Sequence, residues 1–288
     1  MTCPSRPATA TDITELSRLE GENCGHPSVA KGVRGLYRHA SGRTFFRIRM
    51  SKKYKDKTCA YCAAPGASKT DDHVFAGEFV PVAYRPHIPH VPACEKCNHE
   101  KSKLEHYLAT VLLFGGRHAD AIANLQNDGP RRLAKNQRLT RELARGSERI
   151  WTREPSGLAV RALTVPIDDE KVQRLVEYIV RGLMFHYWKV ALGPDCFVDV
   201  HSLPLQEADF AQYRTMRGTN GVQGDIGNGA LVYEGVQGRD NPQISVWELS
   251  LFGGIRIADP DGALVALKYG AITGPQAIKD RAARLRGE

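Results

Sequence analysis

The stretch Cys59-Ala-Tyr-Cys-Ala-Ala-Pro-Gly-Ala-Ser-Lys-Thr-Asp-Asp-His-Val-Phe75 places a Cys-x-x-Cys pair shortly before an Asp-His dipeptide. A second pair, Cys94-Glu-Lys-Cys97, follows the segment Pro86-His-Ile-Pro-His-Val-Pro92. Four thiolates complete the tetrahedral shell of a zinc ion and leave no open position for a substrate. We therefore predict one structural Zn²⁺ held by Cys59, Cys62, Cys94 and Cys97.

The loop between the two pairs is longer than a simple zinc ribbon needs, so it has room for a β-hairpin. This hairpin would carry the segment Asp71-Asp72-His73. We expect the zinc site to stabilise a small fold whose hairpin presents the functional side chains.

Composition and cysteine usage indicate a folded protein in a reducing compartment. The chain has 288 residues, of which 42% are hydrophobic, enough for a sizeable core. It shows no apolar run of about 18 residues and no basic-then-apolar start, so we expect a cytoplasmic protein with no membrane association. Disulfides are rare in that setting, so we expect the remaining cysteines to be free thiols: Cys3, Cys24 and Cys196.

Positive charge is concentrated before the first cysteine pair. Between Lys31 and Lys57 the basic residues face a single acid, Asp56, within a net charge of +8. Residues 36–49 have strand-forming residues on both sides of a Ser-Gly turn, which predicts a β-hairpin. A solvated basic face is one interpretation, and a surface that contacts phosphates is the other. The candidate nucleic-acid contacts are Arg38, Arg43, Arg47, Arg49, Lys52 and Lys53.

Three motifs, taken together and in this order, resemble those of the HNH endonucleases. They are Cys-x-x-Cys, Asp72-His-Val-Phe75 and Val91-Pro-Ala-Cys-x-x-Cys-Asn-x-x-Lys-Ser102. The resemblance covers about residues 58–115. It implies a ββα-metal nuclease unit in which His73 is the general base. It also implies a catalytic divalent ion held by Asp72 and Asn98.

The chemistry of phosphodiester hydrolysis agrees with these residue types. A histidine that titrates near neutrality can activate water. Carboxylate and amide oxygens suit Mg²⁺, which neutralises charge on the phosphate. Lys101, one helical turn after Asn98, is either a phosphate contact or a solvated helix lysine.

The sequence departs from the HNH pattern at the central asparagine. The aligned position carries His87, which can also donate and accept hydrogen bonds, so we include it among the candidate catalytic residues. His90 is an alternative for this position, and neither histidine need fill it. His99 or Glu100 would join the metal shell if the helix were rotated.

The remaining segments predict an α+β fold. A helix is expected at 96–113, a basic helical stretch at 118–151 interrupted at 127–130, and a buried helix at 169–190. Strands are expected at 230–236, 244–252 and 255–258. The predicted organisation is a basic N-terminal segment (1–57), a zinc-clasped HNH unit (58–115), a basic helical linker (116–164) and a C-terminal α+β accessory domain (165–288).

We therefore expect a metal-dependent HNH endonuclease, a hydrolase whose nucleic-acid partner is double-stranded DNA. The preference for DNA comes from the resemblance alone. The alternative is a non-catalytic, zinc-clasped nucleic-acid-binding protein with a degenerate HNH site. Protein partners are not indicated by the sequence.

Overall fold

The computed structural model describes residues 53–116, 119–153, 157–203, 220–258 and 264–286. All of them belong to one compact unit, Met50–Glu288. The hairpin predicted at residues 36–49 lies outside the described residues. Of the predicted nucleic-acid contacts, only Lys53 is described, and it is exposed.

The segment between the two cysteine pairs folds as an antiparallel hairpin, as predicted. Strand β1 (Thr70–His73) pairs with β2 (His90–Ala93). The connection between them holds two 3₁₀ helices, η1 (Gly77–Phe79) and η2 (Val82–His87). Helix α2 (Glu95–Gly115) follows β2 directly. The order of the elements is therefore strand, strand, helix.

Residues 119–164 differ from the predicted helical linker, because they form two helices and a second hairpin. These are α3 (Ala119–Lys135), α4 (Gln137–Gly146), β3 (Glu148–Arg153) and β4 (Ala159–Thr164). The break expected at residues 127–130 is absent, and α3 runs through Pro130. Its second half is anchored by Arg132, whose guanidinium donates to Ala109 O of α2 at 2.8 Å. This tertiary contact offsets the local preference of proline to end a helix.

Helix α5 (Asp169–Trp188) confirms the buried helix predicted from the apolar spacing. Its N-cap is Asp168, whose side chain accepts from Lys171 N at 3.2 Å. The inward face is fully buried at Val172, Leu175, Val176, Ile179 and Leu183. Tyr187, expected on the same face, is 36% exposed, and its hydroxyl lies 2.7 Å from Tyr233 Oη.

An antiparallel sheet follows α5, and its strands are β5 (Cys196–Leu203), β6 (Gly221–Ile226), β7 (Leu231–Gln237), β8 (Ser245–Leu251), β9 (Ile255–Ala258) and β10 (Leu264–Pro275). Their order in the sheet is β5-β10-β8-β7-β6, with β9 paired to β10. The expected strands at 230–236, 244–252 and 255–258 correspond to β7, β8 and β9. A C-terminal helix, α7 (Gln276–Arg286), ends the described chain.

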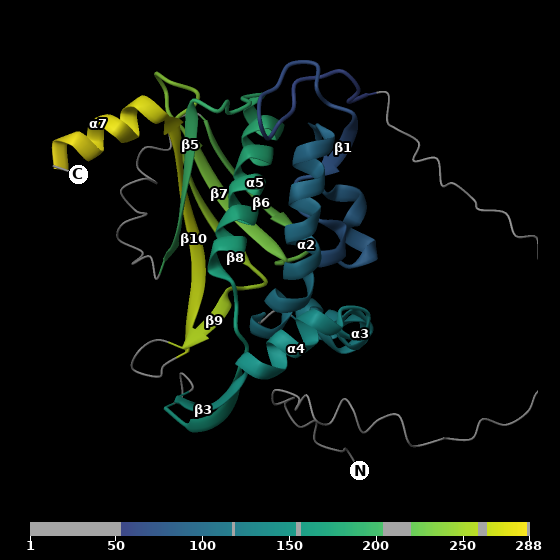
Figure 1. The fold of residues 1–288 in the computed structure, drawn as a ribbon. Helices are drawn as coiled ribbons and strands as arrows, with labels where there is room; N and C mark the ends of the chain where they lie inside the picture. Colours follow the sequence, from purple (N-terminus) through teal and green to yellow (C-terminus); the bar gives the residue numbers. More distant parts are fainter. Residues whose placement is uncertain (1–52, 117–118, 154–156, 204–219, 259–263, 287–288) are drawn as a thin grey trace, which may run out of the picture. The chain divides into compact units, whose positions relative to one another are not determined.

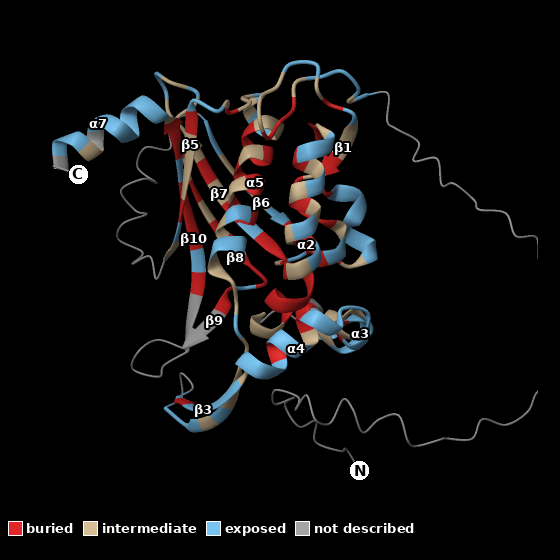
Figure 2. Cartoon of the chain, in the orientation of Figure 1, coloured by how far each residue is buried: buried red, intermediate tan, exposed pale blue. Residues whose placement is uncertain are grey.

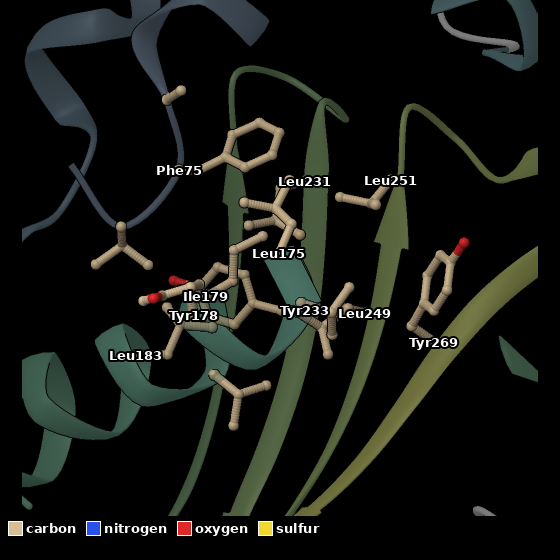
Figure 3. Close-up of a cluster of buried hydrophobic side chains, with 14 of the residues drawn as sticks. Phe75, Leu175, Tyr178, Ile179, Leu183, Leu231, Tyr233, Leu249, Leu251 and Tyr269 are labelled. Atoms are coloured by element: carbon tan, nitrogen blue, oxygen red, sulfur yellow. The ribbon is translucent and has the colours of Figure 1, made fainter. Parts of the chain in front are cut away.

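Helix α5 lies between the sheet and α2, so one hydrophobic core joins the N-terminal hairpin to the sheet (Figure 1). Buried residues follow the facing sides of these elements (Figure 2). Phe75, just after β1, packs in the same cluster as Leu175 of α5 and Leu231 of β7 (Figure 3). The predicted boundary at residue 164 therefore lies within a shared core, and not between two separate cores.

Close contact between α5 and the hairpin depends on a small residue. A Cβ added at Gly182 would lie 3.1 Å from Val74 Cγ2.

No described helix has the length and apolar character needed to cross a membrane.

Candidate functional site

The two Cys-x-x-Cys pairs meet at the start of α2. Their four sulfur atoms lie within 4.8 Å of one another, and Cys62 Sγ is 3.9 Å from Cys94 Sγ. Sulfurs bound tetrahedrally at about 2.3 Å from zinc stand about 3.8 Å apart, so this cluster can hold a zinc ion. Among the described residues, no other group of cysteine, histidine and carboxylate ligands converges in this way.

Backbone donors stabilise the thiolates of this cluster. Cys94 N donates to Cys59 Sγ, and Cys97 N donates to Cys94 Sγ, which caps α2. The hydrogen bond with Cys97 lowers the pKa of Cys59 to about 4, and the same bond raises the pKa of Cys97. The hydrogen bond with Cys97 thus favours the thiolate of Cys59, the form that binds zinc.

The two faces of β1 carry different chemistry, because successive side chains of a strand point to opposite faces. Thr70 and Asp72 face α2, and Asp72 is buried. Asp71 and His73 are on the other face, where His73 pairs across the hairpin with His90. The predicted general base and the predicted carboxylate ligand are therefore on opposite sides of the hairpin.

On the inner face, Asp72 belongs to a buried charge network, defined as Asp72, Lys101 and Glu105. Lys101 Nζ lies 3.0 Å from Asp72 Oδ2 and 2.5 Å from Glu105 Oε1. It also donates to His73 O at 2.6 Å, and Tyr61 Oη donates to Asp72 Oδ2 at 2.6 Å. The lysine side chain is 0% exposed.

This network corrects the expectations for Lys101 and gives Asp72 a structural partner. Lys101 is neither a solvated lysine nor placed to contact a phosphate, because its turn of α2 lies beneath the hairpin. Asp72, the carboxylate expected to hold the catalytic cation, pairs here with the Lys101 ammonium. A buried ammonium would be costly without such partners.

The proton balance of the network gives a testable pH dependence. Burial raises the pKa of Glu105 from 4.5 to about 7, against the opposing effect of Lys101. The folded protein therefore holds this proton more tightly than the unfolded chain does, and the free energy of unfolding falls as pH rises across that range. Glu105→Gln removes this contribution. Between about pH 5.5 and about pH 8, the variant is expected to gain stability relative to the parent by about 1.4 kcal/mol for each pH unit that separates the starting pH from the folded pKa of Glu105.

The measurement is urea unfolding of both zinc-loaded proteins at about pH 5.5 and about pH 8, compared at each pH so that other groups cancel. Glu95→Gln, at an exposed glutamate of the same helix, is the control. An equal difference between Glu105→Gln and the parent at both pH values would contradict the expectation.

The outer face of the hairpin carries a row of three side chains, Asp71, His73 and His90. The rings of His73 and His90 have centroids 4.0 Å apart. His90 Nδ1 is buried and makes no hydrogen bond, yet it lies 3.3 Å from Asp71 Oδ2. Burial lowers the pKa of His73, and the neighbouring His90 adds to the effect. His73 is therefore a neutral imidazole at neutral pH, able to accept a proton.

The other predicted residues are distributed around this row. Asn98 Nδ2 donates to Thr70 Oγ1 at 3.0 Å, so it lies near the start of β1 on the inner face. His87 is exposed at the end of η2, and His90 has the place beside His73. His99 is exposed, and Glu100 accepts from Tyr178 Oη at 2.9 Å.

Sequence reasoning gave no role to Asp71 or Glu105 and left His90 as an alternative. The signal for Asp71 was present, because a residue two positions from His73 in a strand shares its face. Glu105 gave no such signal, since a Lys-Glu pair four residues apart is usual on exposed helices.

A scan of protein-family models found no match to the chain, and searches of curated proteins and of solved structures found no significant match.

Proposed function

We propose that the chain is a metal-dependent endonuclease of the HNH type that hydrolyses phosphodiester bonds in nucleic acid. The observation that carries the proposal is the outward row of Asp71, His73 and His90 on a hairpin fixed by the cysteine cluster. The resemblance of the surrounding motif to HNH endonucleases supports the reaction type, and it also makes DNA the expected substrate.

The donor set of this row fits a divalent cation. His90 offers a buried nitrogen without a hydrogen bond, and the Asp71 carboxylate faces it. A mixed nitrogen and oxygen set suits an ion such as Mn²⁺ better than Mg²⁺, which prefers oxygen ligands. We therefore assign the catalytic cation to Asp71 and His90, in place of Asp72 and Asn98. When bound, such an ion supplies positive charge to the phosphate and the leaving oxygen.

His73 is the proposed general base. Its neutral imidazole accepts a proton from water as the water attacks phosphorus. Its backbone is held in place because its carbonyl oxygen accepts from the buried Lys101. Lys101 thus positions the end of β1 without touching the substrate.

Replacing His73 by alanine is expected to slow cleavage by roughly 100- to 10,000-fold, the usual contribution of a positioned base. Folding and zinc content should be retained, because the bond from Lys101 goes to the backbone carbonyl that alanine keeps. The measurement is the rate of plasmid nicking with Mn²⁺ or Mg²⁺. His99→Ala, an exposed histidine of α2, is the control. Nicking at the parental rate by folded His73→Ala protein would refute the mechanism.

The pair Asp71→Asn and Asp72→Asn tests the revised cation site, because the two changes are chemically identical and lie on opposite faces of β1. Asp71→Asn is expected to raise the Mn²⁺ concentration needed for half-maximal nicking roughly tenfold or more while leaving the melting temperature unchanged. Asp72→Asn is expected to lower the melting temperature, because it removes a charge that faces buried Lys101. If Asp72→Asn instead raised the Mn²⁺ requirement and Asp71→Asn did not, Asp72 would be the cation ligand.

A second candidate is a non-catalytic nucleic-acid-binding protein with a degenerate HNH site. The observation in its favour is that a lysine ammonium pairs with Asp72, the carboxylate that the resemblance assigns to the metal. Binding of DNA without nicking under any divalent ion, by protein that retains its zinc, would favour this candidate.

A further inference from the structure

A cavity of about 810 Å³ lies beside the outer row, and His90 lines it. Its walls come from three segments far apart in the sequence: residues 53–58, residues 87–92 around the start of β2, and residues 185–191 at the end of α5. A cavity of this size accommodates a small organic ligand or one nucleotide.

The charge of the cavity favours an anion. Three lysines line it, Lys53, Lys57 and Lys189, and among the described residues no aspartate or glutamate does. Lys189 is held at the end of α5, where its Nζ donates to His186 O at 2.7 Å. Ammonium groups gathered without a facing carboxylate attract phosphate.

Aromatic and imidazole side chains also line the cavity. Tyr54 is fixed by its hydroxyl, which donates to His90 O at 3.3 Å, and Phe185, another lining residue, packs against the core. His87 and His186 add two imidazoles. Burial lowers the pKa of His186, and the nearby Lys189 adds to this effect, so its ring is neutral at neutral pH. Rings beside lysines are the combination with which proteins bind unstacked bases and their phosphates.

From this lining we propose that the cavity binds one unpaired nucleotide of the nucleic-acid substrate, next to the phosphodiester that faces His73. This inference rests on the proposed function for the identity of the substrate. A base in an intact duplex must first be unstacked and unpaired before it can enter such a cavity, whereas an unpaired base presents a free face to the rings without that cost. The expected substrate is therefore a single strand, or a duplex containing unpaired nucleotides, in contrast to the intact duplex DNA expected from the resemblance.

The test is fluorescence anisotropy with a labelled short oligonucleotide in three forms: single-stranded DNA, single-stranded RNA of the same sequence, and the DNA duplex. Zinc-loaded full-length protein is used in the His73→Ala background, so that cleavage does not remove the probe. At least one single strand is expected to bind roughly tenfold tighter than the duplex. Comparison of the DNA and RNA strands identifies the sugar that the site accepts.

Two sets of variants locate the binding. Tyr54→Leu with His87→Ala removes two rings, and Lys57→Gln with Lys189→Gln removes two charges. Each is expected to weaken single-strand binding roughly tenfold and duplex binding less. The control, Lys103→Gln with Lys135→Gln, makes the same charge change at two exposed lysines of α2 and α3 that do not line the cavity. Melting temperatures verify folding, and the charge pair carries the test if the ring pair unfolds.

Equal affinity for single strand and duplex, or equal losses in the cavity and control variants, would overturn the proposal. The proposed function fails by a different result, which is absence of nicking by the parent protein. Specific single-strand binding without nicking would support the cavity assignment alone. Nicking of intact duplex that is insensitive to the cavity variants would support the endonuclease and refute the cavity.

Discussion

Replacing Cys59 by serine is expected to abolish zinc binding and to destabilise the folded chain strongly. The four cysteines join the loop before β1 to the first turn of α2, and both segments belong to the shared core. Structural zinc contributes about 10–16 kcal/mol in isolated zinc fingers, and here the core supplies part of that stability. A net loss of about 4 kcal/mol would lower the melting temperature by roughly 8–16 °C.

Zinc content by atomic emission and the thermal unfolding curve check this expectation, with one zinc per chain expected in the parent. Cys196→Ser is the matched control, because Cys196 is a buried free thiol outside the cluster. The Cys196→Ser protein should keep its zinc. A Cys59→Ser protein with stoichiometric zinc and the parental melting temperature would show that the cluster is not a structural zinc site.

Replacing Lys101 by methionine is expected to cost about 3–5 kcal/mol of folding free energy, the usual consequence of removing one partner from a buried ion pair. Methionine fills a similar volume, so the loss comes from electrostatics and not from a cavity. The variant leaves the buried carboxyl groups of Asp72 and Glu105 without a cation and removes the donor to His73 O. Nicking should also fall, because the end of β1 loses its anchor.

The double variant Lys101→Met with Glu105→Gln separates the two causes. It removes one of the two uncompensated carboxylates, so part of the lost stability should return, while His73 O still lacks its donor. Urea unfolding at constant zinc is the measurement. Lys103→Met, at an exposed lysine of the same helix, is the control. If Lys101→Met and Lys103→Met unfold at the same urea concentration, the network does not contribute to stability.

Local patterns were sufficient to predict the elements that depend on neighbouring residues. The cysteine pairs indicated the zinc site, and the apolar spacing from Val172 to Leu183 indicated α5. Strands β5 and β10 were not predicted. They pair Cys196–Leu203 with residues 268–275, and this long-range pairing has no short sequence signature.

The candidate site was predicted only in part, for a physical reason. The resemblance selected Asp72 because it adjoins His73, but adjacent residues of a strand point in opposite directions. Lys101 looked like a surface residue because its partners become visible only when α2 packs on the hairpin. The residue types therefore suggested a hydrolytic site with a histidine base. Which of these side chains lie together depends on the two faces of β1, which the residue types do not reveal.

The alternation along β1 also separates two requirements that compete in many active sites. Inward positions stabilise the fold through buried pairs, and outward positions carry the groups that we propose to meet the substrate. If the proposed site is correct, changes at Asp71 or His90 should alter specificity or metal preference at little cost in stability. The hairpin is consequently a suitable starting point for directed evolution, with libraries confined to its outer face and the inner face left intact.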